Sequence, residues 1–342
     1  MNRPPGEILM ACEPWAEALA IQQQTVKQFH RCCAAILEGQ VDLRPLSEKD
    51  LSLQRNLFST LFIMATGAAG VPVADLPFYA MVFQCLRAQV TGCDNILDDE
   101  YKSVIPFALP GEGTKFRSVL TIMTSDMILA KLAIDGLAEG RIDRVQAGNL
   151  PDSVLQVLIP SGIEEHEEES LPEQNIPPVA EILQSTHPRK TGSLFAAPIL
   201  LADRLRATDP QRAAEIAKAL SDFGVGCQIL DDLKDIADDL SRQRHNLILS
   251  HAAHDPSVQE KQLIDEFFRG SRSYREAELV AEQLIAAKAA GLEDAAACFR
   301  RSQEAFCRCF PSFSTQAAKA LGSLIEQSIM SQRNDASSLR SL

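Results

Sequence analysis

Helical periodicity runs through nearly the whole chain and constrains its fold more than any other feature. Apolar residues recur at intervals of three and four positions, whereas the alternation of apolar and polar residues that marks a strand is missing. Leu, Ala, Glu, Gln and Arg, which favour helices, recur throughout, and aromatic residues contribute only 6%. The sequence therefore predicts an all-α protein, built as a single large helical bundle.

Prolines and glycines divide this pattern into separate helices. We expect helices over residues 14–39, from about residue 47, and over residues 76–101, 114–136, 178–207 and 209–238, with more helices after Pro256. Residues 140–178 form the most irregular stretch, and its acidic run, residues 164–169, is interpreted either as a solvated loop or as a mobile flap over a site. Because no change in composition divides the chain, we expect one domain over residues 1–330 and a polar, disordered tail over residues 331–342.

The charge balance disfavours some classes of partner. A formal net charge of −13 argues against nucleic acid and anionic membrane surfaces, since both select for clustered Lys and Arg. No run reaches the ~18 apolar residues of a membrane span, and residues 1–20 lack the apolar core of a signal peptide. The nine cysteines show no zinc-binding spacing and are expected to be reduced thiols. These features predict a cytoplasmic protein without a membrane span or a nucleic-acid partner.

Two clusters of carboxylates interrupt otherwise apolar helices. They read Asp94-Asn95-Ile96-Leu97-Asp98-Asp99-Glu100 and Asp231-Asp232-Leu233-Lys234-Asp235. Each holds two aspartates four residues apart, which lie on one helix face with Cβ atoms about 5–6 Å apart and repel each other. Magnesium suits such a pair because it takes one or two carboxylates and fills its other positions with water and phosphate oxygens. If the two helices face each other in the bundle, the clusters form opposite walls of one metal site.

Three segments carry a resemblance to a known family. Residues 224–235, G-V-G-C-Q-I-L-D-D-L-K-D, resemble the second aspartate-rich motif of the trans-isoprenyl diphosphate synthases and their terpene-synthase relatives. Residues 187–195 are similar to the family's Lys-Thr segment, and residues 239–246 resemble a shortened Asp-Leu-x-x-Gly-Lys stretch with Arg in place of Lys. The resemblance covers about residues 51–246. It implies the isoprenoid synthase fold with a central active-site cavity, three Mg²⁺ ions, a prenyl diphosphate substrate and a homodimer.

The resemblance also implies roles for individual residues. The expected catalytic aspartates are Asp94, Asp98, Asp231, Asp232 and Asp235, and the expected metal ligands are Asp94, Asp98, Asp99, Asp231 and Asp235. Two registers are open for the first cluster, one beginning at Asp94 and one at Asp98, and the first keeps the pair of aspartates four residues apart. Lys190, Arg244 and Arg55 are expected to contact diphosphate.

A cavity for the hydrocarbon chain is expected next to the first cluster. Its predicted lining consists of Phe83, Gly92, Cys93, Phe195 and Gln228. In the family, small residues just before the first cluster leave a deeper pocket. Gly92 and Cys93 therefore predict a farnesyl or longer substrate.

The reaction class follows from what the sequence lacks. Chain-elongating members of the family bind isopentenyl diphosphate through a Gly-Gly-Lys-x-x-Arg-Pro segment and an Arg-Arg-Gly segment, and here only Arg55 is retained. Lys102, Lys115 and Arg117 could partly substitute. This erosion favours a terpene synthase that ionises one allylic diphosphate and cyclises the carbocation. The alternatives are a prenyltransferase that adds isopentenyl diphosphate and a non-catalytic partner subunit.

Overall fold

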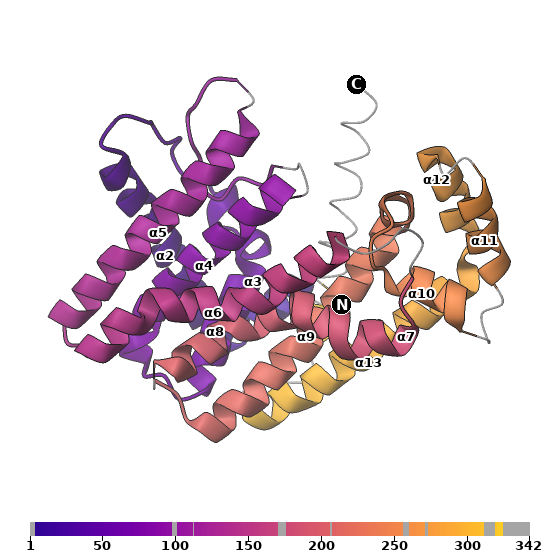
Figure 1. The fold of residues 1–342 in the computed structure, drawn as a ribbon. Helices are drawn as coiled ribbons and strands as arrows, with labels where there is room; N and C mark the ends of the chain where they lie inside the picture. The colour runs from indigo at the N-terminus through magenta and orange to yellow at the C-terminus, as the bar shows by residue number, and fades with distance from the viewer. Residues whose placement is uncertain are drawn as a thin grey trace. The chain divides into compact units, whose positions relative to one another are not determined.

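The structure, a computed structural model, is predominantly helical in the ranges that it describes. These are residues 4–97, 101–111, 113–169, 176–205, 207–255, 260–270, 273–310 and 319–323. Within them the only β-type pairing is an isolated bridge between Leu43 and Phe107. The predicted all-α class is confirmed (Figure 1). None of the helices in these ranges is both long and apolar enough to cross a membrane.

The chain forms two compact units. The N-terminal unit comprises Gly6–Val157 and Pro198–Ala214, and the C-terminal unit comprises Met1–Pro5, Leu158–Ala197 and Glu215–Leu342. The expectation of one domain over residues 1–330 stays a prediction. The tail over residues 331–342 lies outside the described residues.

The N-terminal unit is built around one buried helix. In chain order its elements are α1 (Pro5–Met10), α2 (Glu13–Leu37), η1 (Lys49–Leu51), α3 (Leu53–Ala68), η2 (Val73–Asp75), α4 (Leu76–Leu97) and α5 (Thr114–Ala138). Helix α4 is apolar on nearly every face, which is the pattern of a helix surrounded by others. It packs against α2, α3 and α5. These elements confirm the helices predicted over residues 14–39 and 114–136, and α4 confirms the one predicted over residues 76–101 as far as Leu97.

The C-terminal unit contains the second aspartate cluster. Its elements are α7 (Val179–Glu181), the π-helical turns η3 (Ile182–Thr186) and η4 (Pro188–Gly192), α10 (Leu247–His254), α11 (Lys261–Arg269), α12 (Tyr274–Gln283) and α13 (Ile285–Cys309). Helices α8 (Ser193–Arg204) and α9 (Pro210–Arg242) each include residues of both units. One core cluster joins Ile182, Val225, Ile229 and Leu247, so it ties η3, α9 and α10 together.

The prediction of an irregular stretch over residues 140–178 is wrong for residues 144–169. Residues 144–169 form the continuous helix α6 (Arg144–Glu169), although Pro151 and Pro160 lie within it. Leu150, Val154 and Val157 are buried at helical spacing. Burial of this face offsets the loss of stability that the two prolines cause. Residue preferences alone predict a break at each proline because they leave out this burial.

Candidate functional site

The first aspartate cluster ends helix α4. Asp94 is exposed on its last turns, whereas Asp98 and Asp99 lie outside the described residues. Asn95 is buried; its Nδ2 donates to the carbonyl of Lys102 at 3.1 Å, and its Oδ1 accepts from the Lys102 N–H at 2.8 Å. Asn95 therefore holds the segment that follows α4. The choice between the two metal-binding registers stays a prediction.

The second cluster places two aspartates on one face of α9. The side chains of Asp231 and Asp235 are 50% and 32% exposed, and the Lys234 Nζ lies 3.4 Å from an oxygen of each. Burial, and then the charge of Asp231, raise the pKa of Asp235 to about 6. The pair therefore combines partial access to solvent with a negative charge that one lysine does not offset. Among the described residues no ready-made group of three or more metal-ligating side chains is found.

Asp232 has a different environment from its two neighbours. Its side chain is 1% exposed, and it accepts three hydrogen bonds, from His187 Nε2 at 2.9 Å, Gln228 Nε2 at 2.9 Å and the Leu247 N–H at 2.7 Å. Burial alone would raise the pKa of Asp232, but His187 and the other donors hold it below its usual value. Asp232 is thus an ionised carboxylate whose two oxygens are already bound by protein groups.

Asp239 extends the acidic face of α9 by one more turn. It lies four residues after Asp235, and burial, followed by the charge of Asp232, raises its pKa well above the usual value. The Asn246 Nδ2 donates to its Oδ2 at 2.8 Å. Sequence analysis missed this residue as part of the cluster, although repetition of the four-residue spacing could have revealed it.

Lys190 lies on η4 and is held by two glutamates of α6. Its Nζ is 2.9 Å from both Glu165 Oε1 and Glu168 Oε2. Burial alone would lower the pKa of Lys190, but Glu168 and then Glu165 outweigh it and raise the pKa above its usual value. The ammonium group is therefore charged and fixed in place.

The acidic run is neither a solvated loop nor an irregular flap, because it is helical and largely paired. Arg189 lies 2.9 Å from an oxygen of Glu164 and 3.1 Å from one of Glu167. Glu164 and Glu168 are buried, and the Glu168 Oε1 accepts the backbone N–H of His245. The run thus joins η4 to the segment before α10. The diphosphate role predicted for Lys190 stays a prediction.

The segment around Arg244 has an unusual backbone. Gln243 adopts a left-handed conformation, with φ of 58°. It stands where the resembling Asp-Leu-x-x-Gly-Lys stretch has glycine, which adopts this conformation without strain. The turn is closed by the Arg244 N–H, which donates to the carbonyl of Asp239 at 2.9 Å. The predicted diphosphate role of Arg244 also stays a prediction.

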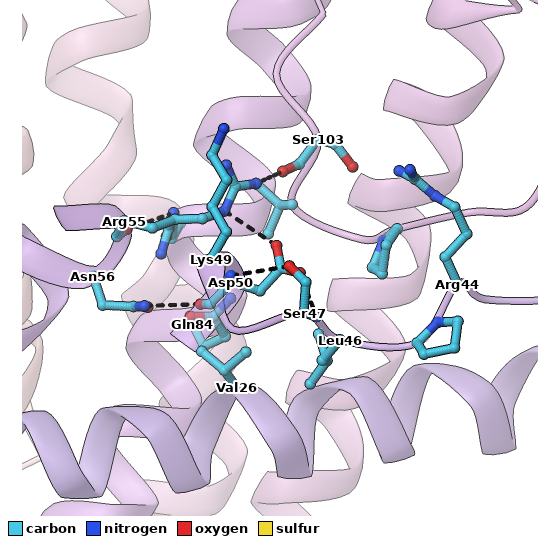
Figure 2. A pocket seen from close by; sticks show the side chains of 14 residues that line it. Val26, Arg44, Leu46, Ser47, Lys49, Asp50, Arg55, Asn56, Gln84 and Ser103 are labelled. Carbon is cyan, nitrogen blue, oxygen red and sulfur yellow. Dashed lines mark hydrogen bonds and ion pairs between the residues drawn. The ribbon is translucent and has the colours of Figure 1, made fainter. Parts of the chain in front are cut away.

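A cationic pocket of about 410 Å³ lies within the N-terminal unit. Its charged lining residues are Arg44, Lys49, Arg55, Arg87 and a single carboxylate, Asp50. In the view of Figure 2, Arg44 and Arg55 stand on different sides of it. Four cations against one acid make this a concave surface suited to an anion with several charges.

Two arginines of this pocket, Arg55 and Arg87, donate to backbone carbonyls. Arg55 donates to the carbonyl of Ser103, and its Nε lies 3.5 Å from Asp50 (Figure 2). Arg87 donates to the carbonyl of Arg55 at 3.3 Å. Burial, and then the charge of Arg55, lower the pKa of Arg87 to about 10. The positive charge at Arg87 is therefore only weakly compensated.

The basic residues that line this pocket differ in part from those named in the sequence analysis. The suggested substitutes Lys102, Lys115 and Arg117 do not line it, and Arg117 instead donates to the carbonyls of Leu109 and Gly111. Sequence analysis missed three of the cations that do. Arg87 could have been found as a charged residue in an apolar helix, two turns before Asp94 on the same face.

The predicted cavity residues have other contacts in the structure. Phe83 is buried with its ring 6.3 Å from that of Tyr79, Phe195 lies 5.9 Å from Phe223, and Cys93 is exposed. Gly92 faces α5, where a Cβ would lie 2.7 Å from Ile122 Cγ1.

Gln228 joins two parts of the second cluster, accepting from the Thr191 hydroxyl and donating to Asp232. The cavity itself stays a prediction.

Comparison with known proteins identifies the fold. No protein-family model matches the sequence, and a search of curated proteins finds no match. Among solved structures, the geranylgeranyl pyrophosphate synthetase of Pyrococcus horikoshii matches with a TM-score of 0.60 and 15% identity, over 92% of this chain and 98% of that chain. The chain has the fold of the prenyl diphosphate synthases.

Two further structures agree. The polyprenyl synthetase of Streptomyces coelicolor gives a TM-score of 0.61 at 16% identity, over 92% of this chain and 99% of that one. The polyprenyl synthase of Caulobacter crescentus, complexed with calcium and isoprenyl diphosphate, gives a TM-score of 0.60 at 14% identity. That match covers 92% of this chain and 97% of that one. The resemblance drawn from the aspartate motifs is thus confirmed at the level of the prenyl synthase fold.

Proposed function

We propose that this protein is a Mg²⁺-dependent enzyme of isoprenoid biosynthesis that adds isopentenyl diphosphate to an allylic prenyl diphosphate. The observation that carries the proposal is the cationic pocket of the N-terminal unit, on a chain with the prenyl synthase fold. A condensation needs sites for two diphosphates, whereas cyclisation needs one. The sequence favours a cyclase because the second basic pocket looks eroded, and Arg44, Lys49, Arg55 and Arg87 remove that reason.

The two partly exposed aspartates of α9, Asp231 and Asp235, fit a divalent cation. Asp231 and Asp235 share a helix face, and the raised pKa of Asp235 reflects burial and a repulsion that a bound cation would relieve. Asp231 and Asp235 would hold Mg²⁺ in the C-terminal unit, and Asp94, on α4, and Asp98 are the other proposed ligands. When bound, Mg²⁺ would neutralise charge on the diphosphate leaving group. Three ions in all, and a homodimer, remain part of the proposal because the resemblance implies them.

The remaining residues would bind and orient the two substrates. Lys190 would add a positive charge near the allylic diphosphate, provided that Glu165 and Glu168 yield part of its hydrogen bonding. The four cations of the pocket would bind the diphosphate of isopentenyl diphosphate. In the reaction the allylic C–O bond breaks and pyrophosphate leaves. A C–C bond then forms to the second substrate, which loses a proton.

Release of pyrophosphate tests this proposal. The purified protein is incubated with Mg²⁺ and geranyl, farnesyl or geranylgeranyl diphosphate, with and without isopentenyl diphosphate. Release that requires both substrates supports condensation, and farnesyl or longer substrates are expected to react best. Release from the allylic diphosphate alone would instead support the cyclase, and no release from any combination would support the non-catalytic subunit.

Arg87→Gln tests the pocket separately. Loss of one charge-assisted contact costs about 1.5–3 kcal/mol, so the KM for isopentenyl diphosphate should rise roughly 10- to 100-fold. The KM for the allylic substrate should stay within about twofold. Arg141→Gln is the matched control, because Arg141 lies on the surface of the same unit and pairs with Glu139. Equal effects of the Arg87 variant on both KM values would contradict the assignment.

A further inference from the structure

A buried hydrogen-bonded pair joins the Lys-Thr segment to the second aspartate cluster. His187 lies between the π-helical turns η3 and η4, and its Nε2 is 2.9 Å from Asp232 Oδ2. Both side chains are 1% exposed. Because an ionised carboxylate only accepts hydrogen bonds, the ring Nε2 must carry the proton. The pair therefore has a fixed donor and a fixed acceptor, and neither side chain is accessible to a substrate.

The contact belongs to a chain of hydrogen bonds that links four side chains. The Thr191 hydroxyl donates to Gln228 Oε1, Gln228 Nε2 donates to Asp232 Oδ1, and Asp232 Oδ2 accepts from His187. These bonds thus fasten residues 187–191 to α9 at two points, His187 and Thr191, on either side of Lys190. π-helical turns are rare and frequent at functional sites. Here His187 and Thr191 contact α9, and Lys190 between them is held by Glu165 and Glu168 of α6.

The same carboxylate holds a third segment. The Leu247 N–H donates to Asp232 Oδ2 at 2.7 Å, and the Asn246 Nδ2 donates to the Asp232 carbonyl at 2.8 Å. Asp232 thereby fixes the start of α10, and with it the segment that carries Arg244. Hydrogen bonds behind a ligating group commonly set its orientation, and their loss costs about 10- to 100-fold in metal affinity or activity.

We infer that His187 is a positioning residue, which sets the place of Lys190 relative to Asp231 and Asp235 by holding Asp232. This inference rests on the proposed function and adds a residue that contacts neither substrate nor metal. Its role needs only the donor at Nε2. A glutamine carries an N–H at the same distance along the side chain, whereas leucine has none.

The test compares His187→Leu with His187→Gln. In the presence of Mg²⁺, the Kd for pyrophosphate is measured by calorimetry and kcat and KM by turnover. We expect His187→Leu to weaken pyrophosphate binding and to lower kcat/KM, each by about 10- to 100-fold. His187→Gln should stay within about threefold of the wild type. His254→Leu is the control, because this exposed histidine of the same unit bonds the Ile176 carbonyl and should change neither value.

The possible failures can be told apart. If the wild type does not bind pyrophosphate with Mg²⁺, the proposed function fails. If Lys190→Ala weakens binding but a folded His187→Leu does not, the function stands and the positioning role is refuted. Should His187→Leu fail to fold, His187→Gln is compared with His187→Asn, whose shorter side chain cannot reach Asp232. Equal values for those two variants would overturn the inference.

Discussion

Gly92→Ala tests whether the small residue before the first aspartate cluster serves packing or the substrate cavity. A Cβ at this position would lie 2.7 Å from Ile122 Cγ1 and 3.1 Å from the backbone oxygen of Ser118 on α5. Contacts this short require α4 and α5 to move apart. Overpacking of this kind costs about 1–3 kcal/mol, and the better helix propensity of alanine returns about 0.5–1 kcal/mol. The net expectation is a loss of about 1–2 kcal/mol.

The assay is urea unfolding followed by the fluorescence of Trp15. This residue is the single tryptophan of the chain, is fully buried, and lies on α2 of the same unit as Gly92. Its signal therefore reports on the N-terminal unit. Gly148→Ala is the matched control, since a Cβ on this helical glycine of α6 would have nothing within 4 Å and the variant should gain about 0.5–1 kcal/mol.

A different outcome would restore the interpretation drawn from the sequence. If Gly92→Ala is as stable as the wild type and shifts the accepted chain length, Gly92 lines the cavity as predicted. Loss of stability without a change in chain length would show that it serves the contact between α4 and α5.

Three further results are expected. Asn95→Ala should cost about 2 kcal/mol in Trp15 fluorescence unfolding, because it removes two part-buried hydrogen bonds between Asn95 and the backbone of Lys102. An unchanged midpoint would refute this. The pKa of His251 is raised because contacts such as that with Asp294 outweigh burial. The protonated His251 therefore stabilises the folded state of the C-terminal unit below about pH 6.5, and this stabilisation is lost as pH rises through the higher folded pKa. A melting temperature, followed by circular dichroism, that does not change between about pH 6 and 8 would contradict this prediction. The pKa of Asp235 is raised to about 6, so at about pH 7 its ionised carboxylate destabilises the folded state. Asp235→Asn should stabilise the metal-free protein by about 1 kcal/mol at pH 7, after allowance for solvent screening. The variant should also gain less stability from added Mg²⁺ than the wild type does. A variant less stable than the wild type without metal would refute this.

Local periodicity was enough to predict most of the helices. Helices α4 and α5 have a strong apolar pattern and few breakers, so their bounds agree closely with expectation. Helix α6 was missed because Pro151 and Pro160 suggested an irregular segment. Its buried face, and the pairing of its glutamates with Arg189 and Lys190, are long-range contacts that sequence spacing does not reveal.

The site shows the same division. The four-residue spacing of Asp231 and Asp235 was visible in the sequence, and so was the resemblance that it carries. The burial of Asn95 and Asp232 could not be predicted from the sequence, because their hydrogen-bond partners Lys102 and His187 lie 7 and 45 residues away along the chain. The cationic pocket escaped prediction for the same reason, since its cations come from separate elements that only the fold of the N-terminal unit brings together.

Incorporation of isotope-labelled isopentenyl diphosphate tests the central claim most directly. The protein is incubated with Mg²⁺, an unlabelled allylic diphosphate and ¹³C-labelled isopentenyl diphosphate, and the products are identified by mass spectrometry. The account predicts a longer prenyl diphosphate that carries the label and is strongly reduced in Arg87→Gln. Unlabelled hydrocarbons or alcohols as the only products would contradict it.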